Sequence, residues 1–214
     1  MRRSLLRLLT EDAQTVVSLN NGLSIKWKDA VPVEIAGNYR IVDGLGAIQA
    51  DFDIRVVVPA NYPYGFPGLW ETSTKIPRDL DRHMFPDGKA CLENPRRIDL
   101  MILRGISLCT FFTDYVHRFF CWQLVYDIDG PAALKGWAHG EEGIREFYCE
   151  ILQTTDTGFI KEVLKRIVFN QLPGRNDLCF CGREEKFKQC HFKTISQLEL
   201  ITKTKLKGDL ELWR

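Results

Sequence analysis

The sequence predicts an α+β fold, in which helices flank an antiparallel sheet built from the first half of the chain. Two observations lead to this prediction. Short apolar or alternating segments separated by turn residues fill the region 23–71, and helical apolar patterns occur before and after it. The chain has 214 residues, enough for one domain of ordinary size and a small appendage. We expect domains at 1–170 and 171–214.

A helix is expected first, over 4–19, because its leucines and valines recur at helical spacing and Asn20-Asn21-Gly22 then ends it. Short strands follow, separated by turns. The last long one, 47–58, alternates apolar and polar residues and ends in an apolar run, as a strand entering a core does. We expect strands at 23–27, 31–35, 39–42, 47–58 and 68–71.

The second half of the chain changes to helical patterns. Residues 107–126 are dense in aromatic residues and apolar on all sides, so we expect them to form the central buried helix. Further helices are expected near 144–152 and over 157–169, the second with one apolar face. Residues 171–174, Gln-Leu-Pro-Gly, look like a linker to the C-terminal part.

Composition gives no reason to expect a nucleic-acid or membrane partner. Hydrophobic residues make up 45%, charged residues 27%, and the net charge is +1. No apolar run approaches the roughly 20 residues that a membrane span needs. The basic start is interrupted by Arg7 and then by Glu11-Asp12, which favours an amphipathic helix over a signal peptide. We therefore expect a cytoplasmic protein.

Seven cysteines are present, an odd number, and no secretion signal accompanies them. This pattern favours reduced thiols that serve as metal ligands or in catalysis over a disulfide framework. Three of them cluster near the C-terminus, and four are dispersed singly. The dispersed cysteines are Cys91, Cys109, Cys121 and Cys149.

The C-terminal cluster has the composition of a structural zinc site. Cys179 and Cys181 are separated by one residue, and the pair Cys190-His191 follows eight residues later. Four such ligands can close a tetrahedron around zinc and leave no position for water. The alternative is a set of free thiols in a disordered tail. A tail with so few apolar residues would gain its folding free energy from the metal.

This tail resembles the SEC-C motif, the zinc motif at the C-terminus of the SecA translocation ATPase. The resemblance is carried by Pro173-Gly-Arg-Asn-Asp177, then Cys-x-Cys-Gly, then the closing Cys190-His191. It implies an interaction or stability module rather than a catalytic one.

Cys91 follows a turn, Pro86-Asp87-Gly88, on a segment with no helical pattern. A thiol presented on such a loop is suited to act as a nucleophile or thioester carrier. Cys109, Cys121 and Cys149 lie instead in expected helices, where a small buried thiol is ordinary. Hydrolysis by Cys91 would need a base, for which His83, His117 and His139 are the candidates in the sequence.

The order of motifs around Cys91 resembles that of the ubiquitin-conjugating (UBC) enzymes. The specific residues are Tyr62-Pro63-x-x-x-Pro67, then His83, and then Gly88-x-x-Cys91-Leu92. Among bacterial proteins, the chain is most similar to the conjugating-enzyme-like proteins of antiviral and ubiquitin-like conjugation operons, including those beside cGAS-like nucleotidyltransferases. The resemblance implies a four-stranded antiparallel meander with flanking helices, and Cys91 as the thioester nucleophile.

One departure from the family pattern concerns the oxyanion. The family has His-Pro-Asn where this chain has His83-Met84-Phe85, so no asparagine transfers, and His83 is implied only as a loop-organising residue. Two roles stay open for Asn94: an amide donor to the thioester carbonyl, or a turn residue before Pro95. Asp99 and His139 are each either a base for the attacking lysine or a solvated loop residue.

The resemblance implies a transferase that carries the C-terminus of a ubiquitin-like protein, or the tail of a cGAS-like nucleotidyltransferase, as a thioester on Cys91. An amine of a protein target would accept it, and a separate activating enzyme would supply it. Two alternatives stay open. One is an inactive UBC-like adaptor that recruits partners through its zinc tail, and the other is a thiol hydrolase.

Overall fold

The computed structural model describes residues 3–130 and 138–213 and divides into two compact units. The first unit takes its residues from 1–93 and 101–136, and the second from 94–100 and 137–214. The chain therefore passes between the units three times. The expected domains at 1–170 and 171–214 were drawn from sequence motifs, whereas the two units are defined by packing. In this division the segment 138–168 belongs to the same unit as the C-terminal cysteines.

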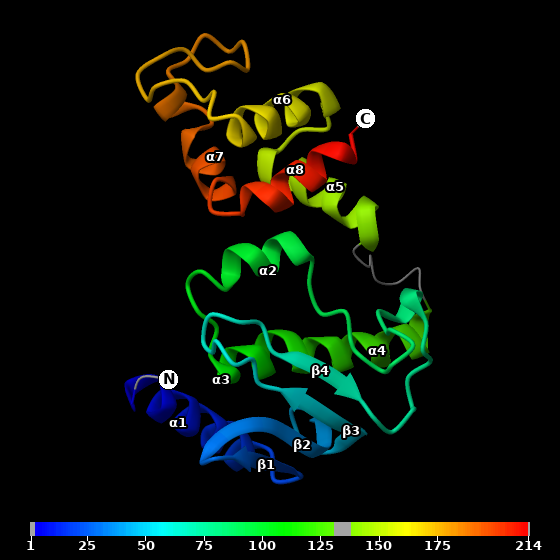
Figure 1. Ribbon diagram of the computed structural model, residues 1–214. Coiled ribbons are helices and arrows are strands. Elements are labelled where there is room, and N and C mark those ends of the chain that lie inside the picture. The colour runs from blue at the N-terminus through cyan, green and yellow to red at the C-terminus, as the bar shows by residue number, and fades with distance from the viewer. Residues whose placement is uncertain (1–2, 131–137, 214) are drawn as a thin grey trace. The chain divides into compact units, whose positions relative to one another are not determined.

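The first unit contains a four-stranded antiparallel meander (Figure 1), as the α+β prediction required. Its strands follow one another in space as in sequence: β1 (Leu23–Lys28), β2 (Val31–Val42), β3 (Ile48–Val57) and β4 (Gly68–Glu71). The expected strands 31–35 and 39–42 are one continuous strand. Gly37 joins them at φ +138°, and its backbone pairs with Leu23 on one side and Ile54 on the other. This approach is so close that a Cβ at Gly37 would lie 2.2 Å from the Gly22 carbonyl oxygen.

Helices cover the apolar face of this sheet. One is α1 (Arg3–Leu19), and the other is a continuous helix made of α3 (Leu108–Phe111), a π-helical segment η2 (Phe112–His117) and α4 (Arg118–Asp129). Phe120 links the layers, because its ring stacks on Phe52 of β3 (4.4 Å between centroids) and lies 5.7 Å from Tyr39 of β2. Polar side chains such as Asn38, Asp51 and Asp53 lie together on the opposite face, as expected of a half-buried sheet.

The expectation that residues 107–126 are buried on all sides was wrong. Only one face of this helix is buried, through residues such as Phe112, Val116 and Phe119. Within 107–126, Asp114 and His117 are exposed. The aromatic residues are concentrated on the sheet-facing side. The dense run of aromatics hid this periodicity in the sequence.

The second unit is helical, with a core of its own. It contains α5 (Gly140–Leu152) and α6 (Thr157–Val168), which confirm two expected helices, and the short helices α7 (Phe192–Leu198) and α8 (Lys203–Glu211), which were not expected. It also holds all of α2 (Pro95–Met101) except its last residue. Two 3-10 turns complete the elements used below: η1 (Leu80–Arg82) in the first unit and η4 (Phe187–Gln189) in the second.

Within the described ranges, none of the helices combines the length and the apolar character that crossing a membrane would require.

Candidate functional site

Cys91 lies at the end of a tight hairpin in the first unit. Its N–H donates a hydrogen bond to the carbonyl oxygen of His83 (2.7 Å), which closes the hairpin. The turn is Pro86-Asp87-Gly88, in which Gly88 has φ +83°, a conformation that other residues adopt only with strain. The Asp87 side chain accepts the N–H of Lys89 (3.0 Å) and tightens the turn. The structure thus places the half-buried Cys91 directly after a rigid turn, as the sequence predicted.

The returning arm of the hairpin is bonded to strand β4. The N–H of Ala90 donates to the carbonyl of Leu69, and the N–H of Glu71 donates to the carbonyl of Gly88, both at 2.9 Å. The fit is close, because a Cβ added to Gly88 would lie 2.9 Å from the Glu71 carbonyl oxygen. The residues that precede Cys91 are therefore attached to the sheet.

A buried ion pair supports this attachment. The Glu71 side chain is fully buried and lies 2.7 Å from the Arg78 guanidinium, whose Nη2 also donates to the Glu71 carbonyl at 2.7 Å. One arginine thus holds both the side chain and the backbone of the residue that pairs with Gly88. An arginine fork is suited to two acceptors at fixed positions.

His83 forms the base of the hairpin. It ends η1 in a left-handed conformation (φ 54°, ψ 36°), and its N–H donates to the carbonyl of Leu80 (2.9 Å). Its ring is 2% exposed and meets Trp122 edge-on, with 5.1 Å between the centroids. These contacts tie the chain on both sides of His83, while its loop-organising role in a reaction stays a prediction.

The turn after β3 is anchored by Tyr62. Its hydroxyl donates to the carboxylate of Asp12 on α1 and accepts the N–H of Leu108 at the start of α3 (3.0 Å). Burial and the bond to Asp12 raise the pKa of Tyr62, so the phenol keeps its proton. The carbonyl of Pro63 accepts the N–H of Ile106 (2.9 Å). The contact between Tyr62 and Asp12, 50 positions apart, has no signal in the sequence.

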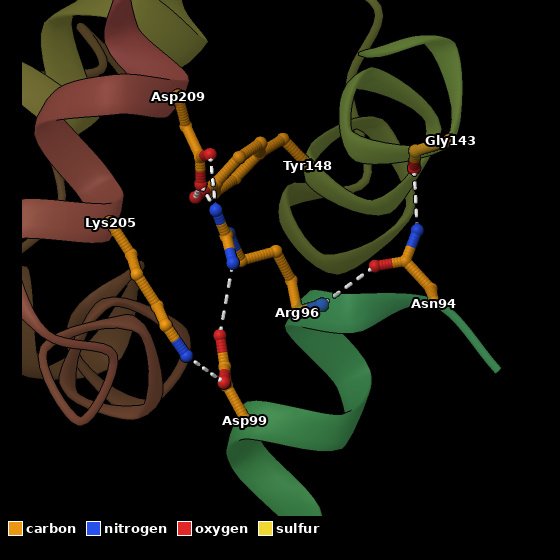
Figure 2. A network of polar contacts seen from close by, with 7 residues as sticks. All are labelled: Asn94, Arg96, Asp99, Gly143, Tyr148, Lys205 and Asp209. Atoms are coloured by element: carbon orange, nitrogen blue, oxygen red, sulfur yellow. Dashed lines mark hydrogen bonds and ion pairs between the residues drawn. The ribbon is translucent and has the colours of Figure 1, made fainter. Parts of the chain in front are cut away.

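Asn94 belongs to the second unit, where it directly precedes α2 (Figure 2). Its amide nitrogen donates to the Gly143 carbonyl (2.7 Å), and its amide oxygen accepts the N–H of Arg96 (2.9 Å). The side chain is buried. The bond to the Arg96 N–H is local and fits the turn role that was weighed for Asn94, whereas the bond to Gly143 joins distant parts of the chain. The role of donor to a thioester carbonyl stays a prediction.

Asp99, a candidate base, also takes part in this polar network. It lies on α2 and pairs with the guanidinium of Arg96 (3.1 Å) and with the Lys205 ammonium (Figure 2). His139, another candidate, is the residue that precedes α5. A role as base for the attacking lysine stays a prediction for Asp99 and for His139.

His117, the third histidine weighed as a base, lies near a different thiol. Its Nε2 is 3.4 Å from Cys121 Sγ, and its Nδ1 is 3.3 Å from the Tyr39 hydroxyl. Burial raises the pKa of Cys121 and also of the other dispersed helical thiols, Cys109 and Cys149. A raised pKa reduces the thiolate fraction, in keeping with structural thiols.

The C-terminal cysteines and His191 come together in the second unit as the spacing predicted. All four ligand atoms lie within 4.8 Å of one another. His191 Nδ1 is 3.3 Å from Cys179 Sγ and 3.1 Å from Cys190 Sγ, and Cys181 Sγ is 3.4 Å from Cys190 Sγ. Bonds of about 2.0–2.3 Å to a tetrahedral zinc ion would place ligand atoms about 3.5–3.8 Å apart, so small adjustments would suffice.

Backbone geometry brings the two halves of this cluster together. Leu178 pairs with Lys186 across a small hairpin, and the N–H of Cys179 donates to the carbonyl of Glu185 (2.8 Å). Gly182, at φ +80°, allows the chain to turn back directly after Cys181. The chain then reaches the second ligand pair, and α7 begins immediately after His191.

Aromatic rings surround the cluster and tie it to the helices. Phe187 is 2% exposed and meets Phe192 edge-on (5.6 Å), while Phe159 of α6 stacks on Phe180 (5.6 Å) and lies 5.0 Å from the His191 ring. The buried ring of Phe187 lies beside the metal-binding residues. The metal ligands are therefore part of the core of the second unit.

The electrostatics of the cluster bear on metal binding. Burial raises the pKa of Cys190 to about 12, with contributions from the nearby Cys181 and Cys179 thiols. Burial and the charge of Arg183 lower the pKa of His191, which favours the neutral imidazole that binds metals. A zinc ion would displace the thiol protons and stabilise the thiolates.

Comparison with known proteins agrees with this donor set. Residues 175–193 match the family model of the SEC-C motif, a zinc-binding motif. No curated protein and no solved structure matches the chain. The SEC-C match covers the metal ligands and leaves the Cys91 hairpin outside it. Zinc is thus the metal that the cluster and the motif together indicate.

Proposed function

We propose that the chain is a conjugating-type cysteine acyltransferase, in which Cys91 carries the C-terminus of a protein as a thioester. The carried chain is a ubiquitin-like protein or the tail of a cGAS-like nucleotidyltransferase, and a separate enzyme activates it. The setting that we propose is a bacterial antiviral pathway in the cytoplasm. The zinc ion is structural and takes no part in the chemistry.

The observation that carries this proposal is the position of Cys91 after the meander. An N-terminal helix, three antiparallel strands, an anchored Tyr62-Pro63 turn, a fourth strand and a rigid hairpin with a terminal thiol occur in that order. The UBC enzymes that the sequence resembles have the same order. A reactive thiol on a rigid loop is also what a thioester carrier needs, because the acyl group must be accessible to a second protein.

The chemistry consists of two acyl transfers. In the first, the Cys91 thiolate attacks the carbonyl carbon of an activated C-terminus, a C–S bond forms, and the activating group leaves with its electron pair. In the second, an amine attacks the thioester carbonyl, the C–S bond breaks, and Cys91 leaves as a thiolate. The amine proton passes to a base or to water, and an amide remains.

A chemically prepared donor tests this proposal without the activating enzyme. A ubiquitin-like protein is converted to a C-terminal mercaptoethanesulfonate thioester and mixed with the full chain. We expect an adduct on non-reducing gels that disappears with a thiol reductant. The Cys91→Ser variant should form an oxygen ester that survives the reductant, because a thiol does not readily cleave it.

A second cysteine provides the matched control. The Cys149→Ser variant alters a half-buried helical thiol and should load as the wild type does. The proposal is wrong if Cys91→Ala forms the same reducible adduct as the wild type, or if no variant with an intact Cys91 forms one.

The second candidate function is a binding module without acyl transfer. The bond from the Asn94 amide to the Gly143 carbonyl favours it, because the nearest candidate oxyanion donor in the sequence is engaged within the second unit. Thiol reactivity separates the two functions. Alkylation of Cys91 in the folded chain much faster than that of Cys149 would support the enzyme, and equal rates would support the binding module.

A further inference from the structure

The short helix α2 follows Cys91 in sequence but belongs to the unit that holds the metal ligands. Only Leu92 and Glu93 separate Cys91 from Asn94, where the second unit begins. The helix has seven residues and none of them is buried. So short a helix does not form stably by itself, because its nucleation cost exceeds what a few backbone bonds return. Its position must come from contacts with other elements, and residues 95–100 make theirs within the second unit.

The strongest of these contacts is a two-pronged ion pair with the C-terminal helix. Arg96 donates from Nε and Nη2 to the two carboxylate oxygens of Asp209 on α8, both at 2.6 Å (Figure 2). The Tyr148 hydroxyl donates to the same carboxylate at 2.5 Å. Asp209 is 2% exposed, so its charge depends on these donors. Removal of one partner of such a buried pair is strongly destabilising.

Further contacts hold both ends of α2. The first residue before it, Asn94, is bonded to Gly143, and Asp99 within it pairs with Lys205 of α8. Leu100 packs against the apolar core of the second unit. The helix is therefore attached to α5 and α8 by polar groups and to the core by one leucine.

That core also contains the metal-binding loop. Cys179 and Phe187 of the loop, Ile195 of α7 and Leu206 of α8 are buried in the same cluster. A loop held by four metal ligands gains its ordered structure from the metal, so loss of the metal weakens the packing under α7 and α8. Asp209 lies on the helix that would be affected.

We infer that zinc in the second unit positions α2, and with it the chain on the C-terminal side of Cys91, through the Asp209–Arg96 pair. Arg96 and Asp209 are positioning residues, since they act on Cys91 only through the chain between 91 and 96. For its effect on acyl transfer this inference rests on the function proposed above. Its structural part, the coupling of α2 to the metal, is independent of that function.

Hydrogen exchange on the full chain tests the coupling. The zinc-loaded wild type, the same protein treated with a chelator, and Asp209→Asn are compared in peptides that cover 95–101. We expect exchange of these amides to speed up about tenfold or more in both perturbed samples, while peptides from β3 in the first unit keep their protection. Lys207→Gln, at an exposed position on the same helix α8, should exchange as the wild type does.

A double variant covers the case in which Asp209→Asn fails to fold. Arg96→Met/Asp209→Leu removes both charges and leaves neither of them buried without a partner, so this variant should fold. Zinc removal should speed the exchange of its α2 amides by about half the wild-type factor or less. Its Cys91 alkylation rate should differ from that of the wild type. Unchanged α2 exchange after zinc removal, with the 178–192 loop deprotected, would overturn the inference. So would equal loss of protection in β3, which would indicate global unfolding.

The outcome for the proposed function is read separately. Coupling of α2 to zinc in a protein whose Cys91 takes no acyl group would leave this inference standing and refute the acyltransferase. Normal loading of Cys91 with α2 exchange independent of zinc would do the reverse.

Discussion

Two glycines of the first unit have nearly the same backbone conformation but different surroundings. Comparing them measures how much the close packing of the Cys91 hairpin against β4 contributes to stability. Gly88 in the hairpin has φ +83° and Gly46 in the turn between β2 and β3 has φ +84°. A Cβ at Gly88 would lie 2.9 Å from the Glu71 carbonyl oxygen and 3.2 Å from Arg78 Nη2, whereas a Cβ at Gly46 would have no atom within 4 Å among the described residues.

Replacing each glycine by alanine should therefore have unequal effects. The left-handed conformation costs an alanine about 1 kcal/mol at either position. At Gly88 the hairpin must also move away from Glu71. This weakens the bond from the Glu71 N–H to the Gly88 carbonyl and the bond from Arg78 to the Glu71 carbonyl, each worth about 1 kcal/mol. We expect a destabilisation of about 1 kcal/mol for Gly46→Ala and about 3 kcal/mol for Gly88→Ala.

Hydrogen exchange of β3 amides in increasing urea measures the free energy of unfolding of the first unit alone. The rate of Cys91 alkylation, measured in parallel, should change in Gly88→Ala and stay constant in Gly46→Ala. Equal destabilisation by the two substitutions would show that the contacts around Gly88 contribute nothing. The proposed fixation of the hairpin by β4 would then be wrong.

Three further predictions concern the anchors and the metal. Tyr62→Phe should cost the first unit about 1–3 kcal/mol, because the Leu108 N–H loses its acceptor, whereas Tyr64→Phe at an exposed position should cost nothing measurable by urea unfolding. Arg78→Met should cost about 3 kcal/mol in the same assay, since the buried Glu71 carboxylate loses its cation; a cost below about 1 kcal/mol would contradict the ion pair. Zinc affinity, measured by competition with a chromogenic chelator, should fall between about pH 8 and pH 6, because the thiol protons must leave on binding, and a pH-independent affinity would exclude thiolate ligands.

The features predicted well from the sequence depend on neighbouring residues. Strand β4 has the predicted bounds, and the hairpin before Cys91 follows from Pro86-Asp87-Gly88, whose turn chemistry is local. The metal cluster was predictable for the same reason, since its ligands span 179–191 and their spacing alone indicates zinc.

The features that were missed depend on residues far apart in sequence. Arg96 and Asp209 are separated by 113 positions, and nothing in the short charged segment 95–101 indicates a helix without its partner on α8. The continuous strand through Gly37 was missed because a glycine inside a strand pattern suggests an interruption, whereas here it permits close pairing with two neighbouring strands. Distant pairing of this kind has no signal in a single sequence.

The order in which the chain is synthesised determines when the Arg96–Asp209 pair can form. A chain leaving the ribosome exposes Cys91 and α2 early, but Asp209, the buried partner of Arg96, is made only when α8 is synthesised. Domains generally fold as their residues emerge, so the meander can form while α2 still lacks its partners. The segment behind the thiol is then among the last parts to become ordered. A nascent or C-terminally truncated chain would have the thiol in place without the ordered segment behind it.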